Sequence, residues 1–240
     1  LGRPVEEILG KHCWEVLHRD QSGPCSFCPV PRLLERHAGG ESGTYVWELH
    51  NNVTGKWYMV KDSIVRWIDG ARAHLGTFVD ITYRKQYEEQ LKRFAATDAM
   101  TDVYNRKWGY GKLDELYHLP AGERGDLTMC FIDLDGLKLV NDRLGHAAGD
   151  EMIVNTIRAI FSCIRREDFI CRWGGDEFIL VLHCNQADAS RVMDKVLFAI
   201  DHFNATQGKP YTISISFGLV DFASDFASLD ELIDEADRRM

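Results

Sequence analysis

The sequence predicts an α+β fold in two parts: an antiparallel sheet with helices, then a connecting helix, then a central sheet flanked by helices. Three observations support this fold class. Strand-like runs separated by turn residues occupy residues 44–82, a narrow apolar stripe at helical spacing follows them, and helix-like and strand-like segments alternate from Thr97 onward. We therefore expect domains at 1–82 and 97–240, joined by a helix at 83–96.

The first part is expected to begin with helical turns. Apolar residues fit such turns from Pro4 to Leu17, with an interruption at Gly10, and a loop rich in Gly, Pro and Cys follows. Three strand-like runs come next, with Asn- and Gly-containing turns between them: Thr44–His50, Trp57–Trp67 and Ala73–Thr82. Because such short turns join neighbouring strands, these runs predict an antiparallel meander.

The connecting segment carries Tyr87, Leu91 and Phe94 among charged residues. Spacings of four and three residues place them along one narrow side of a helix, as in a coiled-coil seam. A surface helix lying on its own domain would show the same pattern over so short a stretch. Both interpretations stay open at this point.

The second part alternates between strands and helices. The strand-like segments are Leu127–Leu134, Phe169–Trp173, Phe178–His183 and Tyr211–Val220. The helix-like segments are Leu139–Arg165, Asp188–Phe203 and Leu229–Met240. Alternation of this kind is typical of a sandwich in which helices cover a sheet.

The composition disfavours several classes of function. A formal net charge of -9 and a pI of about 5.5 disfavour binding to nucleic acid or to an anionic membrane, because both need a basic surface. The chain shows no apolar run long enough to cross a membrane and no signal peptide. Seven cysteines leave at least one thiol unpaired, and four of them lie in apolar segments, so we expect a reducing, cytoplasmic location.

Two acidic groups predict a metal site in the second part. Asp176 and Glu177 follow two glycines at the tip of an expected hairpin, and Asp133 lies near the end of a buried-type strand. If that strand neighbours the hairpin, the carboxylates meet, and two carboxylates about 4 Å apart repel by roughly 4 kcal/mol at an effective dielectric constant of about 20. Oxygen ligands and this need for positive charge favour Mg²⁺. The alternative is a solvated turn, because Gly and Asp are common turn residues.

Several ordered motifs surround these acids. They are Asp98–Arg106, Asp133–Asp142, Gly145–Asp150, the pentapeptide Gly174-Gly175-Asp176-Glu177-Phe178, Ser214–Gly218 and Ala236–Met240. In this order and at these spacings, the chain from about Ala96 to Met240 resembles the GGDEF domain of diguanylate cyclases. The resemblance implies that two GTP molecules condense to cyclic di-GMP and pyrophosphate, with two domains facing each other in a homodimer.

The resemblance also implies roles for individual residues. The implied ligands of Mg²⁺, or of Mn²⁺, are Asp133, the backbone carbonyl of Leu134, Asp176 and Glu177, and the three acids are the implied catalytic residues. The implied substrate contacts are Lys138, the backbone at Gly136 and Leu137, the open turn at Gly174 and Gly175, and the base-reading residues Asn141 and Asp150. An ionised carboxylate only accepts hydrogen bonds, and guanine offers it two adjacent donors, so GTP is favoured over ATP.

Two further features leave alternatives open. Arg165 and Asp168 fit Arg-x-x-Asp, separated from Gly174 by five residues, which resembles the family's inhibitory site for cyclic di-GMP; a solvated helix end is the alternative. The whole domain could instead be a catalytically weak or inactive receptor for GTP or cyclic di-GMP, although the signature acids are intact. The family's basic segment after its last helix is expected beyond Met240.

Residues 1–82 resemble a PAS sensor domain through the segment Val79-Asp80-Ile81-Thr82-Tyr83-Arg84-Lys85, which is close to that family's closing motif. The resemblance implies two further strands before Leu1 and a bound signal of unspecified chemistry. Cys13, Cys25 and Cys28 suggest Zn²⁺ binding or a redox-active pair. Reduced thiols in a loop are the alternative, because one Cys-x-x-Cys lacks a second half.

Overall fold

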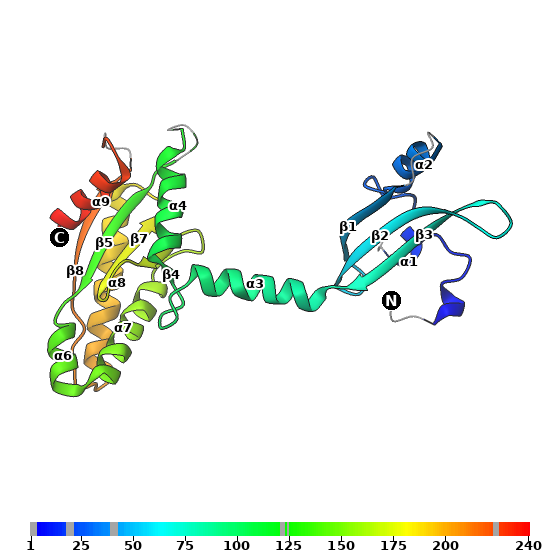
Figure 1. Cartoon of the computed structure of the whole chain (residues 1–240). Helices are drawn as coiled ribbons and strands as arrows, with labels where there is room; N and C mark the ends of the chain where they lie inside the picture. Colours follow the sequence, from blue (N-terminus) through cyan, green and yellow to red (C-terminus); the bar gives the residue numbers. More distant parts are fainter. Residues whose placement is uncertain (1–3, 18–21, 39–42, 121–122, 124, 223–225) are drawn as a thin grey trace. The chain divides into compact units, whose positions relative to one another are not determined.

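The computed structural model (Figure 1) describes residues 4–17, 22–38, 43–120, 123, 125–222 and 226–240. The chain divides into two compact units, residues 1–91 and 92–240, and each unit is described by itself. Among the described helices, none is both long and apolar enough to cross a membrane.

The N-terminal unit consists of short helices followed by an antiparallel sheet of three strands. Its elements are the 3₁₀ helix η1 (Val5–Glu7), α1 (Cys13–Leu17), α2 (Val30–Ala38), β1 (Thr44–Asn51), β2 (Lys56–Arg66) and β3 (Arg72–Asp80). The strand order β1-β2-β3 confirms the predicted meander. The predicted helical turns from Pro4 to Leu17 form only as η1 and α1, because Gly10 between them adopts a left-handed φ of 75°.

A small core holds this unit together. Leu17 of α1 packs with Leu49, Tyr58 and Val60 of the sheet, and all four are buried. The Asn51 side chain stabilises the β1–β2 turn, because its oxygen accepts hydrogen bonds from the backbone N–H groups of Val53 and Thr54. The sheet therefore has one packed face with only a few buried residues.

Helix α3 (Thr82–Ala96) begins where the carboxylate of Asp80 accepts the backbone N–H of Thr82 at 3.0 Å. Its apolar stripe is uncovered: Tyr83, Tyr87, Leu91 and Phe94 are each more than half exposed. Tyr83, Tyr87 and Leu91 are thus not buried against the N-terminal unit, and the coiled-coil seam stays a prediction.

The C-terminal unit contains a five-stranded sheet in the order β4-β6-β7-β5-β8. Its elements are β4 (Tyr104–Asn105), α4 (Arg106–His118), β5 (Thr128–Leu134), α6 (Leu137–Leu144), α7 (His146–Phe161), β6 (Phe169–Arg172), β7 (Glu177–Leu182), α8 (Gln186–Thr206), β8 (Ile215–Asp221) and α9 (Leu229–Arg238). The short β4 runs parallel to β6, and the other neighbours are antiparallel.

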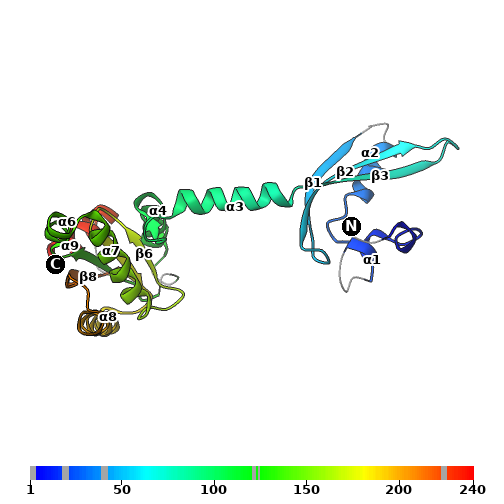
Figure 2. The same cartoon turned by 90° about the horizontal axis from the view of Figure 1, so that it is seen from below.

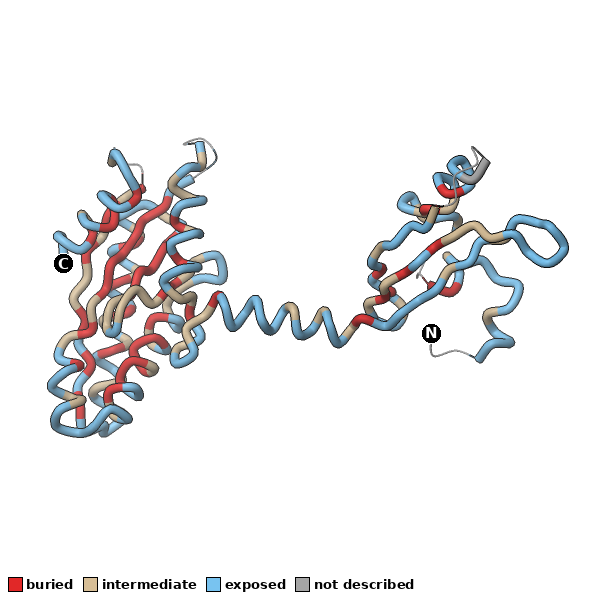
Figure 3. The backbone as a smooth tube through the Cα atoms, in the orientation of Figure 1, coloured by how far each residue is buried: buried red, intermediate tan, exposed pale blue. Residues whose placement is uncertain are grey.

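Both faces of this sheet are covered by helices (Figures 1 and 2), and the strand β5 shows how. Its residues Cys130, Ile132 and Leu134 face a core shared with α6, α7 and α8, whereas Met129 and Phe131 face a core shared with α4 and α9. Figure 3 shows the resulting run of buried residues along the central strands. The predicted α+β sandwich is thus observed in this unit.

Most predicted elements in this unit differ from the observed ones by up to three residues at an end, and two differ by more. The helix expected over Leu139–Arg165 is divided at Gly145, whose φ of 87° lies in a region that few other residues adopt, and α7 ends at Phe161. The strand expected over Tyr211–Val220 begins only at Ile215. Before it, the side chain of Asn204 accepts the N–H and donates to the carbonyl of Ile213, which replaces a partner strand.

Candidate active site

Two predicted acids lie on neighbouring strands of the C-terminal unit. Asp133 of β5 is the direct cross-strand partner of Glu177, the first residue of β7. Directly opposed residues point to the same face of a sheet and lie close together. The backbone N–H of Leu134 also donates to the carbonyl oxygen of Asp176 at 3.0 Å, so the strand end and the hairpin are joined. The expected proximity is observed, with Glu177 rather than Asp176 directly opposite Asp133.

The electrostatics around Asp133 suit a divalent cation. Burial raises the pKa of Asp133, and the nearby carboxylates of Asp176, Asp135 and Glu177 raise it further. Within the described residues, no three His, Cys, Asp or Glu side chains converge as a complete metal site. Mg²⁺ needs only one or two carboxylates beside substrate phosphates and water, and this oxygen-only, negatively charged donor set fits it.

The glycines of the hairpin make room for the Glu177 carboxylate. A Cβ atom at Gly174 would lie only 2.3 Å from Oε2 of Glu177. The backbone carbonyl of Glu177 accepts the N–H groups of Trp173 and Gly174 at 2.8 and 3.2 Å, which closes the turn. Any side chain at position 174 would therefore displace the carboxylate.

Arg172 fixes the hairpin tip, a role that the sequence analysis did not assign. Its guanidinium donates to the carbonyl of Gly174 at 3.2 Å and to that of Gly175 at 2.7 Å. It also forms an ion pair with Asp98 at 3.1 Å, with 15% and 23% of the two side chains exposed. Burial alone would raise the pKa of Asp98, but the Thr101 hydroxyl and Arg172 lower it below its usual value. The tip is thus tied to the loop that follows α3.

The loop between β5 and α6 is also held firmly. The carboxylate of Asp135 accepts hydrogen bonds from Ser214 at 2.6 Å and from Ser216 at 2.9 Å. Gly136 then takes a left-handed φ of 74° and begins α6. In the first turn of that helix, the side chain of Leu137 is buried and that of Lys138 is exposed. The loop therefore presents a helix N-terminus and a cation, both of which favour anions.

The two predicted base-reading residues lie on consecutive helices. Asn141 is on α6 and Asp150 is on α7, where its side chain is exposed. Gly149 allows the helices to approach at this point, since a Cβ there would lie 2.0 Å from Oδ1 of Asn141. The orientation of Asn141 thus depends on the absence of a side chain at position 149.

The aspartate of the Arg-x-x-Asp segment accepts hydrogen bonds from backbone N–H groups. The carboxylate of Asp168 accepts the backbone N–H groups of Arg165 at 2.8 Å and of His183 at 2.9 Å, and its side chain is only 5% exposed. Arg165, in contrast, is 72% exposed and lies 3.9 Å from Glu167. Asp168 is therefore already hydrogen-bonded to the backbone of its own domain, whereas the Arg165 side chain is accessible to solvent.

The predicted cysteine group of the N-terminal unit lies close together. Burial raises the pKa of the Cys13 thiol, and the neighbouring Cys25 and Cys28 raise it further. The seven cysteines are all described and form no disulfide. No metal-binding group of three or more side chains includes them in the part of the chain that is described. Both the ligand and the loop interpretations of these thiols stay predictions.

A family model for the diguanylate cyclase GGDEF domain matches residues 95–240. The chain belongs to this family. The match covers the acid pair, the hairpin and the β5–α6 loop. The match to the GGDEF family does not extend over residues 1–82. Their resemblance to a PAS domain therefore stays a prediction, for which the antiparallel sheet gives only weak support.

Known relatives agree with the GGDEF assignment. The chain is 33% identical over 235 residues to diguanylate cyclase DgcM of Escherichia coli, which covers 97% of this chain and 55% of that protein. It is 31% identical over 184 residues to cyclic di-GMP phosphodiesterase PdeB of Shewanella oneidensis, covering 75% of this chain and 21% of that protein. The chain thus spans about half or less of these relatives.

A solved GGDEF domain has the same fold. The GGDEF domain of TpbB from Pseudomonas aeruginosa superposes with a TM-score of 0.53 at 32% identity, covering 59% of this chain and 84% of that one. The share of the chain that is covered, 59%, is close to the size of the C-terminal unit, residues 92–240.

Proposed function

We propose that this chain carries a diguanylate cyclase activity, in which two GTP molecules condense to cyclic di-GMP with release of two pyrophosphates. Residues 97–240 would be the catalytic domain, residues 83–96 the signalling helix, and residues 1–82 a PAS-like sensor domain that regulates it. The observation that carries the proposal is the opposed pair Asp133 and Glu177, within a GGDEF domain whose motifs are intact.

The residues of the site divide into three groups by chemistry. Asp133, Asp176, Glu177 and the carbonyl of Leu134 would hold a divalent cation, Mg²⁺ or Mn²⁺. When bound, such a cation offsets phosphate charge and lowers the pKa of a nearby hydroxyl. Lys138 and the backbone at Gly136 and Leu137 would bind phosphate oxygens. At the guanine edge, Asp150 would accept hydrogen bonds, and Asn141 can both accept and donate them.

In this proposal, each domain binds one GTP, and the 3′-hydroxyl of one attacks the α-phosphate of the other. The P–O bond to the new ester would form as the bond to pyrophosphate breaks, and Glu177 would take the hydroxyl proton. Because both nucleotides must meet, two domains have to face each other, which requires a homodimer. Positioning and electrostatics supply most of the acceleration in such phosphoryl-type reactions.

The direct test is to incubate the purified chain with GTP and Mg²⁺ and to separate the products by chromatography. Cyclic di-GMP and pyrophosphate are the expected products. Tight binding of GTP or cyclic di-GMP without turnover would reject the cyclase in favour of a receptor. The similarity to a relative named as a phosphodiesterase makes that second outcome worth measuring.

Replacing Gly149 with Ala should weaken GTP binding. The new methyl group would meet Oδ1 of Asn141 at 2.0 Å, so the Asn141 side chain must rotate away from its present position. We expect the KM for GTP to rise by roughly tenfold, the scale of one lost hydrogen bond with its strain. Steady-state kinetics would measure this.

Gly111→Ala is the matched control for this substitution. Gly111 is on the exposed side of α4, and nothing lies within 4 Å of the position its Cβ would occupy. The change should leave KM unaltered and slightly favour the helix. If the two variants had equal KM values, Asn141 would not contact the substrate.

Cyclic di-GMP is expected to inhibit its own synthesis through Arg165. The exposed guanidinium can pair with a phosphate of the product, while Asp168 holds the turn from which Arg165 projects. Arg165→Ala should raise the inhibition constant for cyclic di-GMP by about tenfold or more, whereas Arg166→Ala, which changes an adjacent exposed arginine, should not. Equal inhibition of both variants would refute this site.

The exposed stripe of α3 is proposed to pair with the same stripe of a second chain. Leu91→Glu places a charge in that seam and should reduce both dimer formation and specific activity at low protein concentration, by roughly tenfold. Gln90→Glu adds the same charge to an exposed position beside the stripe and should change neither. Sedimentation and activity across a dilution series would show this. Activity independent of dilution and of Leu91→Glu would contradict the seam.

A further inference from the structure

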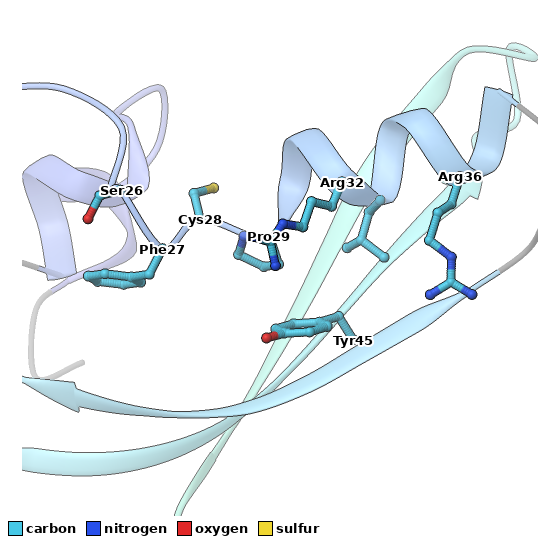
Figure 4. Close-up of a pocket in the computed structure, with 8 residues that line it drawn as sticks. Ser26, Phe27, Cys28, Pro29, Arg32, Arg36 and Tyr45 are labelled. Carbon is cyan, nitrogen blue, oxygen red and sulfur yellow. The ribbon is translucent and has the colours of Figure 1, made fainter.

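The N-terminal unit contains a cavity of about 400 Å³, and Cys28 of the cysteine group described above contributes to its wall (Figure 4). It lies between the cysteine-containing loop, helix α2 and strand β1. Its walls include Ser26, Phe27, Arg32, Leu33, Arg36 and Tyr45. With a water molecule occupying about 30 Å³, this space admits a small organic molecule of roughly a dozen non-hydrogen atoms.

The charge on the cavity wall is positive. Arg32 and Arg36 are four residues apart on α2, so they project from the same side of the helix. None of the described residues that line the cavity is acidic. Both arginines are exposed, and the guanidinium of Arg36 lies beside Gly43, 3.6 Å from the position of a Cβ there. Two guanidinium groups on one wall favour an anion.

The rest of the wall is aromatic and apolar. In Figure 4, the ring of Tyr45 lies on the β1 side of the space beneath α2, and Phe27 lies at its other end. Leu33 contributes a buried aliphatic side chain, and the Tyr45 hydroxyl adds a hydrogen-bond donor. An inorganic ion would leave these apolar surfaces in contact with water, whereas an organic anion would cover them.

We propose that this cavity is a binding site for a small organic carboxylate with an apolar or aromatic body. The carboxylate is held by Arg32 and Arg36, and the body packs against Phe27, Leu33 and Tyr45. The site is independent of the GTP chemistry, and it gives the N-terminal unit a defined class of ligand. Phosphate esters share part of this chemistry, so the test includes free phosphate.

The test uses the full chain and phenylacetate as the probe. Calorimetric titration and thermal melting should show binding and a higher Tm with phenylacetate, but not with the neutral isostere phenylacetamide. Succinate and inorganic phosphate carry the charge without the ring and should bind more weakly. Arg32→Gln and Arg36→Gln should each weaken phenylacetate binding by about tenfold or more, the scale of a hydrogen bond between charged groups. Arg72→Gln, which removes an exposed arginine on β3, should not.

Several results would overturn the proposal. Equal binding of phenylacetamide would show that the arginines do not select a charge. Inorganic phosphate binding as tightly as phenylacetate would indicate a phosphate site instead. Unchanged affinity in both arginine variants, or no binding by any probe to about 10 mM, would reject the site. If an arginine variant failed to fold, Tyr45→Phe would test the same wall, with weaker phenylacetate binding expected. No readout depends on cyclase activity.

Discussion

Replacing Glu177 with Gln is expected to abolish cyclic di-GMP synthesis while the C-terminal unit stays folded. Gln has the size of Glu but neither its charge nor its capacity to take a proton. Glu177 is opposite Asp133 in the structure, and the proposed mechanism uses both the charge of Glu177 and its capacity to take a proton. Loss of a positioned acid–base group that also stabilises charge lowers a rate by at least about 100-fold. The amount of cyclic di-GMP formed from GTP and Mg²⁺ measures this.

The melting temperature of the Glu177→Gln variant should not fall together with its activity. Glu177 is one of the carboxylates that raise the pKa of Asp133, so its neutralisation removes repulsion. The Tm without metal should therefore be equal to or above that of the parent chain. Glu115→Gln, at an exposed position on α4, is the matched control and should retain full activity. A Glu177→Gln variant with near-normal turnover would refute the assignment of the acid.

Arg172→Gln should produce the second largest loss, about 10- to 100-fold in kcat, with GTP binding less affected. The guanidinium holds the carbonyls of Gly174 and Gly175 and reaches Asp98, and Gln is too short and uncharged to replace these contacts. A displaced hairpin tip misplaces Glu177, and misplacement by about 1 Å is enough for such a loss. Steady-state kinetics with GTP separates kcat from KM.

A surface arginine provides the comparison for Arg172. Arg191 pairs with Asp188 on α8 and is 75% exposed, so Arg191→Gln should change little. Asp98→Asn should give an intermediate loss, because the carbonyl contacts of Arg172 remain. If Arg172→Gln lowered Tm but left kcat unchanged, the residue would be purely structural.

Elements with a clear apolar period were predictable from the sequence, and α4 shows why others were not. Its buried residues are only Gly109 and Leu113, and it contains two glycines, so it lacks an apolar stripe. A Cβ at Gly109 would lie 2.4 Å from Sγ of Cys171, so close packing on β6 requires glycine there. The strand predicted from Tyr211 begins only at Ile215, because Asn204 rather than a neighbouring strand pairs with Ile213.

The residues of the candidate site also divide into those that local sequence patterns indicate and those that only the structure reveals. Asp133, Asp176 and Glu177 were predictable because acids beside glycines and strand ends are local patterns. The role of Arg172 depends on Asp98, which is 74 residues away in the sequence. One of the hydrogen bonds that Asp168 accepts comes likewise from another segment, from the backbone N–H of His183, 15 residues away. Contacts between distant segments leave little trace in a single sequence, although an arginine two residues before a pair of glycines was a usable hint.

The position of β5 has a consequence for how this site can be controlled. The strand is paired on both edges and covered on both faces, so its amide protons should exchange with solvent only when the whole unit unfolds. Asp133 shares that backbone. A regulatory signal is therefore not expected to act by loosening the backbone that holds Asp133. It is expected to change the position of the whole rigid C-terminal unit relative to its partner. Hydrogen exchange should then find β5 equally protected in active and inactive states.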